Sequence, residues 1–296
     1  MTSASTMART GRGGSPERGF GKWGDRHPLG AAAAFFGMWL AALVALSAAA
    51  PLATSALSGA PAAVRLILEV ISLVSALVPA IACPLLLGGA AARRRTAARE
   101  GLRFGVGLVA GAAWFALVFG ALAALSAVDL GSPSNVPALP AWIAACAANA
   151  AFQEVLVRGY AFDALARGKG IVFAAVVTTV VFTVFHPGAF ACGPVAVLQI
   201  AAASVLLTLV RIASGGLAAP IGMHAAWNAV GGIGFGVVSL ADDYPSVFDV
   251  SLGGPALLSG GAMGGEGGVV ALAVTCVLCA AAFAIRPRLR SNCQCG

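Results

Sequence analysis

The feature that most constrains this chain is a series of long apolar runs separated by short polar connections. Of its 296 residues 59% are hydrophobic and 10% are charged, whereas about a quarter of the residues in a soluble domain are charged. The chain is therefore predicted to be a polytopic membrane protein. It should be all-α, because helices satisfy their own backbone in lipid without forming a closed barrel. About eight transmembrane helices are expected, near residues 29–56, 62–89, 104–128, 137–165, 171–185, 194–212, 217–240 and 269–285.

The basic residues indicate the orientation of these helices. There are 18 Lys and Arg against 11 Asp and Glu, and the basic ones cluster between apolar runs. Cytoplasmic loops collect Lys and Arg, so both termini are expected in the cytoplasm and the protein in the plasma membrane. This placement argues against nucleic-acid binding. We expect a disordered basic tail over residues 1–28, one transmembrane domain over 29–290 and a short tail over 291–296.

The most informative stretch lies inside the fourth apolar run, from Phe152 to Tyr160. Glu154 and Arg158 are expensive at membrane depth, about 2.5–3.5 kcal/mol each on insertion scales. Such residues are retained where they face a partner or a watery cavity. They stand four apart and therefore share one helix face, so a purely structural ion pair is one interpretation. A functional site is the other.

Two further polar pairs recur at the same spacing and favour a functional site. Phe182 and His186 close the fifth run, and His224 and Asn228 lie in the inner half of the seventh. Together with Glu154 they predict a polar intramembrane cavity. Glu154 and the histidines can activate water, and a His with an Asn can stabilise an oxyanion, as in a hydrolase. No metal is predicted, but zinc stays open, because Glu154, His186 and His224 match a catalytic ligand set.

The three stretches resemble the signatures of the CAAX protease and bacteriocin-processing family. This family includes the type II CAAX prenyl endopeptidases and lysostaphin-resistance-like intramembrane peptidases. Its pattern is E-E-x-x-x-R-G, F-x-x-x-H and H-x-x-x-N or H-x-x-x-D, which appears here in order at residues 153–159, 182–186 and 224–228. The resemblance covers about residues 138–236. It implies an endopeptidase that acts on peptides or proteins in or at the lipid bilayer. No cofactor is predicted apart from the zinc alternative.

The resemblance also implies roles for individual residues. The first Glu of the family pattern activates water together with the second-motif histidine, which is His186 here. His224 and Asn228 would form the oxyanion hole, and Arg158 would hold Glu154 or the substrate. Phe182 would support His186.

One position departs from the family pattern, because Gln153 stands where the first Glu is expected. An amide has no titratable site near neutral pH and cannot act as a general base. Glu154 follows it, about 100° around the helix. Three alternatives remain: Glu154 has taken over the role of the base, a metal or water network has, or the protein is catalytically silent. In the last case it would be a peptide-binding, scaffold or immunity membrane protein.

Overall fold

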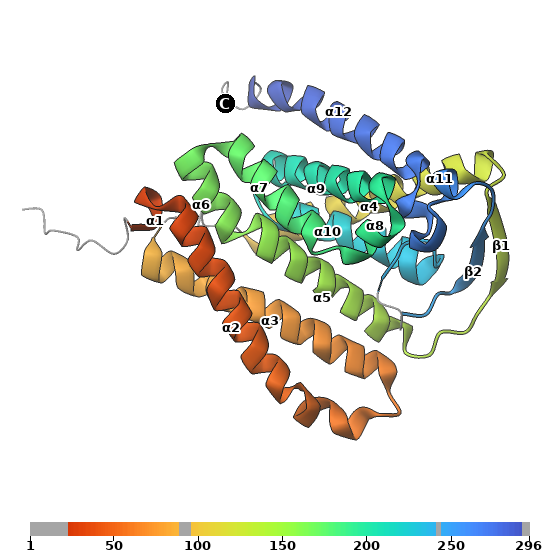
Figure 1. Ribbon diagram of the computed structural model, residues 1–296, viewed down its shortest axis with the longest axis horizontal. Helices are drawn as coiled ribbons and strands as arrows, with labels where there is room; N and C mark the ends of the chain where they lie inside the picture. Colours follow the sequence, from red (N-terminus) through yellow and green to blue (C-terminus); the bar gives the residue numbers. More distant parts are fainter. Residues whose placement is uncertain (1–22, 89–95, 241–243, 292–296) are drawn as a thin grey trace, which may run out of the picture.

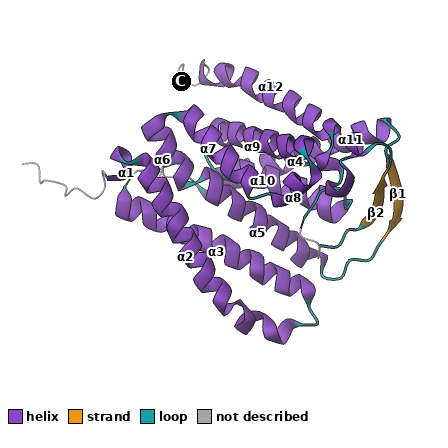
Figure 2. Cartoon of the chain, viewed as in Figure 1, coloured by secondary structure: helices purple, strands orange, loops and turns teal. Residues whose placement is uncertain are grey.

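The computed structural model describes residues 23–88, 96–240 and 244–291, and helices dominate them (Figures 1 and 2). Two short helices are α1 (Trp23–Arg26) and α11 (Ala256–Ser259). Each predicted apolar run contains a longer helix. These and the helices between them are α2 (Pro28–Thr54), α3 (Pro61–Leu87), α4 (Ala97–Ala124), α5 (Leu139–Arg158), α6 (Tyr160–Lys169), α7 (Ile171–Val184), α8 (Pro187–Cys192), α9 (Pro194–Ser214), α10 (Ala218–Asn228) and α12 (Val269–Ser291).

Prolines and glycines set several helix ends. Proline occupies the first turn of α2, α3, α8 and α9, where its missing N–H costs no hydrogen bond. The predicted break at His186 and Pro187 is confirmed, since α7 ends at Val184 and α8 starts at Pro187. The fourth run was expected to be continuous over residues 137–165. Instead α5 ends at Arg158, and α6 begins after Gly159.

The membrane character of the chain is supported by helix length and composition. Within the described residues, five helical segments are long and apolar enough to cross a bilayer. They are Pro28–Leu57, Pro61–Leu87, Ala97–Ala124, Leu139–Lys169 and Pro194–Ser214. The apolar parts of α7 and α12 are shorter, and α10 has 11 residues. The predicted count of eight crossings thus exceeds the five that length and composition identify.

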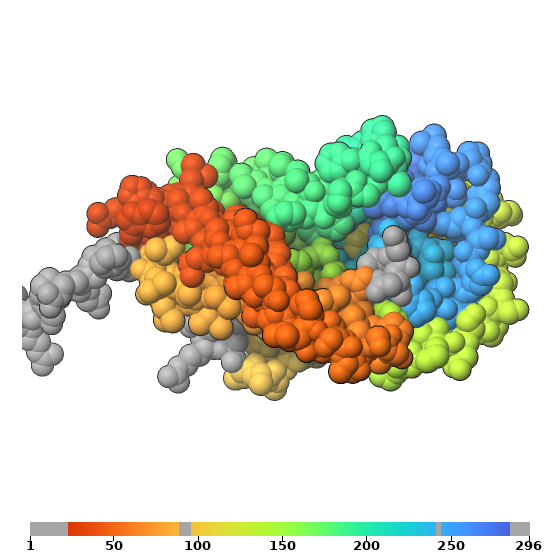
Figure 3. All heavy atoms as spheres, turned by 60° about the horizontal axis from the view of Figure 1, so that its bottom comes forward, coloured from red at the N-terminus to blue at the C-terminus, as the bar shows by residue number. Residues whose placement is uncertain are grey.

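Helix α5 occupies the middle of the molecule and brings the candidate residues together. It packs against α3 on one side and against α7 and α10 on the other (Figure 1). Helices α2 and α3 run side by side across one face (Figure 3), and α12 packs on α9 and α4. The centre of the molecule is therefore made by helices that are distant in sequence.

Small residues let α4 and α10 approach closely. Gly107 and Gly111 are four residues apart, and a Cβ on either would overlap the backbone of Ala219 or Met223 in α10. Small residues at this spacing are a common device for packing helices in membranes. The stacked rings of Trp114 and Trp227, 3.8 Å apart, continue the same interface. This packing fixes the helix that carries His224 and Asn228.

A two-stranded sheet is the exception to the all-helical prediction. Strands β1 (Val128–Pro133) and β2 (Phe248–Leu252) pair antiparallel, with Val128 opposite Leu252. They lie together at one end of the molecule (Figure 2). The sequence reasoning treated both segments as irregular connections, because β1 is short and contains the turn-forming residues Gly131, Ser132 and Pro133.

The described part of the chain starts before the predicted domain boundary at residue 29. Helix α1 lies within the predicted tail, and Asp25 pairs with Arg167 of α6 at 3.2 Å. The remainder of that tail, residues 1–22, and all but Ser291 of the C-terminal tail lie outside the described residues.

Candidate active site

The intramembrane ion pair is present and wholly buried. Arg158 Nη1 lies 2.8 Å from Glu154 Oε1, and both side chains have no solvent exposure. His224 Nδ1 from α10 lies 3.0 Å from the same carboxylate oxygen. An ionised carboxylate can only accept hydrogen bonds, so His224 Nδ1 carries a proton and donates it in a hydrogen bond to Glu154 Oε1. Glu154 therefore joins α5 to α10 and fixes the orientation of the His224 ring.

Arg158 uses the rest of its guanidinium on α9. Its Nη2 donates to Ser204 O at 2.9 Å and to Ser204 Oγ at 2.8 Å, and its Nε donates to Thr208 Oγ1 at 3.2 Å. Its Cζ also lies 4.8 Å from the centre of the Phe182 ring. A buried charge with this many partners is firmly held. Arg158 thus organises three helices around Glu154.

His186 lies between α7 and α8 with one ring nitrogen occupied. Nδ1 is 2.6 Å from the carbonyl oxygen of Phe182, and a carbonyl can only accept, so Nδ1 is the donor. The neutral ring then has its lone pair on Nε2, which makes no hydrogen bond among the described residues. The Phe182 ring lies 4.4 Å from that of His186 and 6.0 Å from that of His224. His186 and His224, from different helices, therefore lie against the same phenyl ring.

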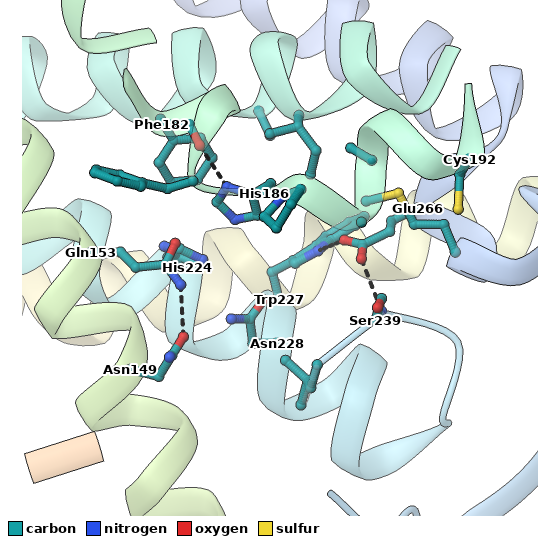
Figure 4. A pocket seen from close by; sticks show the side chains of 18 of the residues that line it. Asn149, Gln153, Phe182, His186, Cys192, His224, Trp227, Asn228, Ser239 and Glu266 are labelled. Atoms are coloured by element: carbon teal, nitrogen blue, oxygen red, sulfur yellow. Dashed lines mark hydrogen bonds between the residues drawn. The ribbon is translucent and has the colours of Figure 1, made fainter. Parts of the chain in front are cut away.

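A cavity of about 500 Å³ adjoins these side chains. Gln153, His186, His224 and Asn228 all line it (Figure 4). A second hollow of about 420 Å³ shares Ser239, Leu240, Tyr244, Ala262 and Met263 with it. Glu154 and Arg158 are not among the described residues that form the wall. The polar set predicted from sequence is therefore brought together, with the ion pair behind the wall and the other four residues on it.

Gln153 is tied to helix α3 through a chain of polar contacts. Its Nε2 donates to Asn149 Oδ1 at 2.8 Å, and Asn149 Nδ2 donates to Glu69 Oε2 at 2.9 Å. Glu69 in turn pairs with Arg65, four residues earlier in α3, at 3.4 Å. Gln153 Oε1 is buried and has no partner among the described residues. This oxygen can accept a hydrogen bond from a ligand but cannot take a proton from it.

A family comparison decides what this arrangement resembles. Residues 135–230 match the family model for Rce1-like type II CAAX prenyl endopeptidases. The family resemblance expected from the three motifs is thereby confirmed, and all three lie within this Rce1-like segment. The segment is about a third of the chain. No curated protein and no solved structure matched the chain.

The possible metal ligands of the site are a separate question from its match to the family. Among the described residues, no group of three or more His, Cys, Asp and Glu side chains is placed to hold an ion. The alternative zinc set, Glu154, His186 and His224, is not such a group. Glu154 Oε1 and His224 Nδ1 bind each other, and His186 Nδ1 is held by a carbonyl. Only Nε2 of each histidine and Glu154 Oε2 are left as potential ligand atoms in this set.

Sequence reasoning missed one carboxylate on the cavity wall, which lies outside the Rce1-like segment. Glu266 precedes α12, and its exposed fraction is 7%. Oε1 accepts from the backbone N–H of Ser239 at 2.8 Å, and Oε2 accepts from Trp227 Nε1 at 3.4 Å (Figure 4). Burial raises the pKa of Glu266 to about 7. In the sequence Gly264-Gly265-Glu266-Gly267-Gly268 it looks like part of a flexible outer loop, and only the fold reveals its burial.

Proposed function

We propose that this protein is an intramembrane endopeptidase that hydrolyses peptide bonds of membrane-associated peptides or proteins. The observation that carries the proposal is the placement of His186, His224 and Asn228 on the wall of one cavity. A nucleophile-activating base and two oxyanion donors are the minimum set for hydrolysis of an amide. The match of residues 135–230 to the Rce1-like family supports the same reaction class.

The proposed mechanism starts at His186. Its Nε2 removes a proton from a water molecule, whose oxygen attacks the carbonyl carbon of the scissile bond. Gln153 Oε1 accepts the second hydrogen bond of that water and orients it. The carbonyl oxygen becomes negative and receives hydrogen bonds from the side-chain amide of Asn228 and from His224, whose ring Glu154 orients through Nδ1. The carbon–nitrogen bond then breaks, and the His186 imidazolium returns the proton to the leaving amine.

Glu154 has a positioning role in this scheme. The sequence predicted it as a candidate base, but one oxygen is shared between Arg158 and His224, and the residue is absent from the described cavity wall. Its second oxygen, Oε2, is buried and has no hydrogen-bond partner among the described residues. To activate a water molecule in the cavity, the side chain would have to turn toward the wall and disturb its ion pair with Arg158, and breaking a buried ion pair costs about 3–5 kcal/mol. We therefore assign water activation to His186 and the orientation of His224 to Glu154.

The alternative is a catalytically silent protein that binds peptides in the same cavity. Gln153 favours it, because the amide stands where the family pattern has a carboxylate. The two functions differ in what replacing Gln153 by Glu does. A silent protein gains hydrolysis, whereas an enzyme that relies on His186 changes little.

The proposed enzyme lies in the plasma membrane with both termini in the cytoplasm. With eight crossings, most clusters of basic residues fall on the cytoplasmic side of the membrane. The three crossings beyond the five long segments would be α7, α10 and α12. Helix α10 reaches the necessary length with the π-helical stretch Ala229–Gly234 that continues it. On this arrangement the cavity lies at membrane depth.

Incubation of the purified protein with a peptide library tests the proposal. The protein is reconstituted in lipid nanodiscs, and new peptide termini are identified by mass spectrometry. Asn228→Ala should lower the cleavage rate by about 100-fold or more, as loss of one oxyanion donor does. Asn135→Ala is the matched control, because this asparagine is exposed in the connection after β1. Equal cleavage by the native protein and Asn228→Ala, or no cleavage by the native protein, contradicts the proposal.

A further inference from the structure

The carboxylate of Glu266 is buried on the cavity wall without a cation. Ser239 N–H and Trp227 Nε1–H are its hydrogen-bond partners, and among the described residues no Lys, Arg or His pairs with it. The other carboxylate on the wall, Glu69, has Arg65 as its partner. Glu266 therefore gives the cavity a negative group whose counter-charge the described part of the protein does not supply.

The stretch of sequence that contains Glu266 carries acidic residues and no Lys or Arg. Between Ile212 and Ile285 the sequence contains four acidic residues, Asp242, Asp243, Asp249 and Glu266, and no Lys or Arg. No Lys or Arg is found among the described residues of the cavity wall either. A ligand with a positive charge would therefore meet no Lys or Arg among the described residues of this wall.

Burying a carboxylate in this way is unfavourable for folding. Two hydrogen bonds recover part of the lost hydration, and burial still raises the pKa of the group to about 7. A glutamine could accept the same bond from Ser239 without carrying a charge. A costly ionisable group in a cavity is a candidate for ligand binding.

We infer that Glu266 binds a cationic side chain of the substrate, a lysine or arginine close to the scissile bond. The indole of Trp227 lies beside the carboxylate on the same wall, so it can contact the aliphatic part of that side chain while Glu266 meets the charge. His186, His224 and Asn228 line the same cavity and would meet the neighbouring peptide bond. This inference rests on the proposed peptidase function for its catalytic consequence, but not for binding.

The experiment compares three peptides that differ at one position, carrying Lys, Gln or Glu, on the protein in nanodiscs. Their inhibition constants are measured by fluorescence anisotropy against a labelled lysine peptide, and their cleavage rates by mass spectrometry. The native protein should bind the lysine peptide about tenfold or more tightly than the glutamine peptide, as expected for a hydrogen bond between charged groups. Glu266→Gln should reduce that ratio to near one.

Two further variants separate charge selection from misfolding. Glu266→Asp keeps the charge and should retain a preference for lysine, whereas Asp249→Asn removes an exposed carboxylate from β2 and should leave the ratio unchanged. If the native protein and Glu266→Gln prefer the lysine peptide over the glutamine peptide by the same ratio, the inference is overturned. If the native protein cleaves no peptide but prefers lysine only while Glu266 is intact, the proposed peptidase function fails and the binding site stands.

Discussion

Replacing Glu266 with glutamine should remove a loss of stability that the native protein suffers as the pH rises from 4.5 to 7.5. Burial raises the pKa of this carboxyl from its ordinary value of 4.5 to about 7. The folded protein therefore holds the proton more tightly than the unfolded chain. The contribution of Glu266 to stability is fully present below pH 4.5 and is lost as the pH rises through about 7, because the unfolded chain then releases a proton that the folded protein retains. The difference between the two pKa values corresponds to about 3 kcal/mol.

Glu266→Gln removes this pH dependence. The glutamine places an amide N–H opposite Trp227 Nε1–H, which adds a penalty, but that penalty is the same at every pH. The difference in free energy of unfolding between the variant and the native protein should therefore shift by about 3 kcal/mol in favour of the variant from pH 4.5 to pH 7.5. The direct neighbours of the carboxyl, Ser239 N–H and Trp227 Nε1–H, do not titrate in this range. His186 and His224 on the same cavity are present in both proteins and cancel in the comparison.

Thermal unfolding in detergent at several pH values measures this gain. The melting temperature of Glu266→Gln relative to the native protein should rise by roughly 5–10 °C from pH 4.5 to pH 7.5, at a few degrees per kcal/mol. Asp249→Asn, an exposed carboxylate change, is the control. A difference between Glu266→Gln and the native protein that does not change with pH would refute the reasoning.

Three other predictions concern the cavity and its support. Gln153→Glu should change the cleavage rate less than about threefold if His186 is the base, and a large increase would favour the silent alternative. Gly111→Leu should lower the free energy of unfolding by about 1–3 kcal/mol or more, because the new side chain forces α10 away from α4. Gly120→Leu, whose side chain meets open space, should not lower it. Equal melting temperatures for the two variants would contradict this prediction. Treatment with a chelator should leave cleavage unchanged, and loss of activity restored by zinc would revive the metal alternative.

The sequence predicted most helices because hydrophobicity dominates helix placement in a membrane protein. The break at His186 and Pro187 was also readable, since proline cannot continue a helix. The pairing of β1 with β2 could not be predicted from the sequence. The two strands are short and over a hundred residues apart, and neither contains a local pattern that indicates its partner. The end of α5 at Arg158 was hidden by the apolar residues on both sides of Gly159.

The spacing of the motifs predicted which residues form the candidate site, but it did not predict which of them line the cavity and which lie behind its wall. Residues four apart share a helix face, so His224 with Asn228 and Glu154 with Arg158 were sound pairs. Which of Gln153 and Glu154 reaches the cavity depends on the rotation of α5 against its neighbours, and hydrophobic periodicity is weak in a helix buried on several sides. Glu266 was overlooked because burial of a glycine-flanked loop is a tertiary property.

The most direct test of the central claim compares His186→Ala with His27→Ala in heavy-oxygen water. His27 precedes α2 and lies away from the cavity, so it is the matched histidine control. Cleavage by the native protein and by His27→Ala should place one heavy oxygen in each new carboxyl group at equal rates. His186→Ala should be slower by about 100-fold or more. Equal rates for all three proteins would show that the cavity does not carry out the hydrolysis.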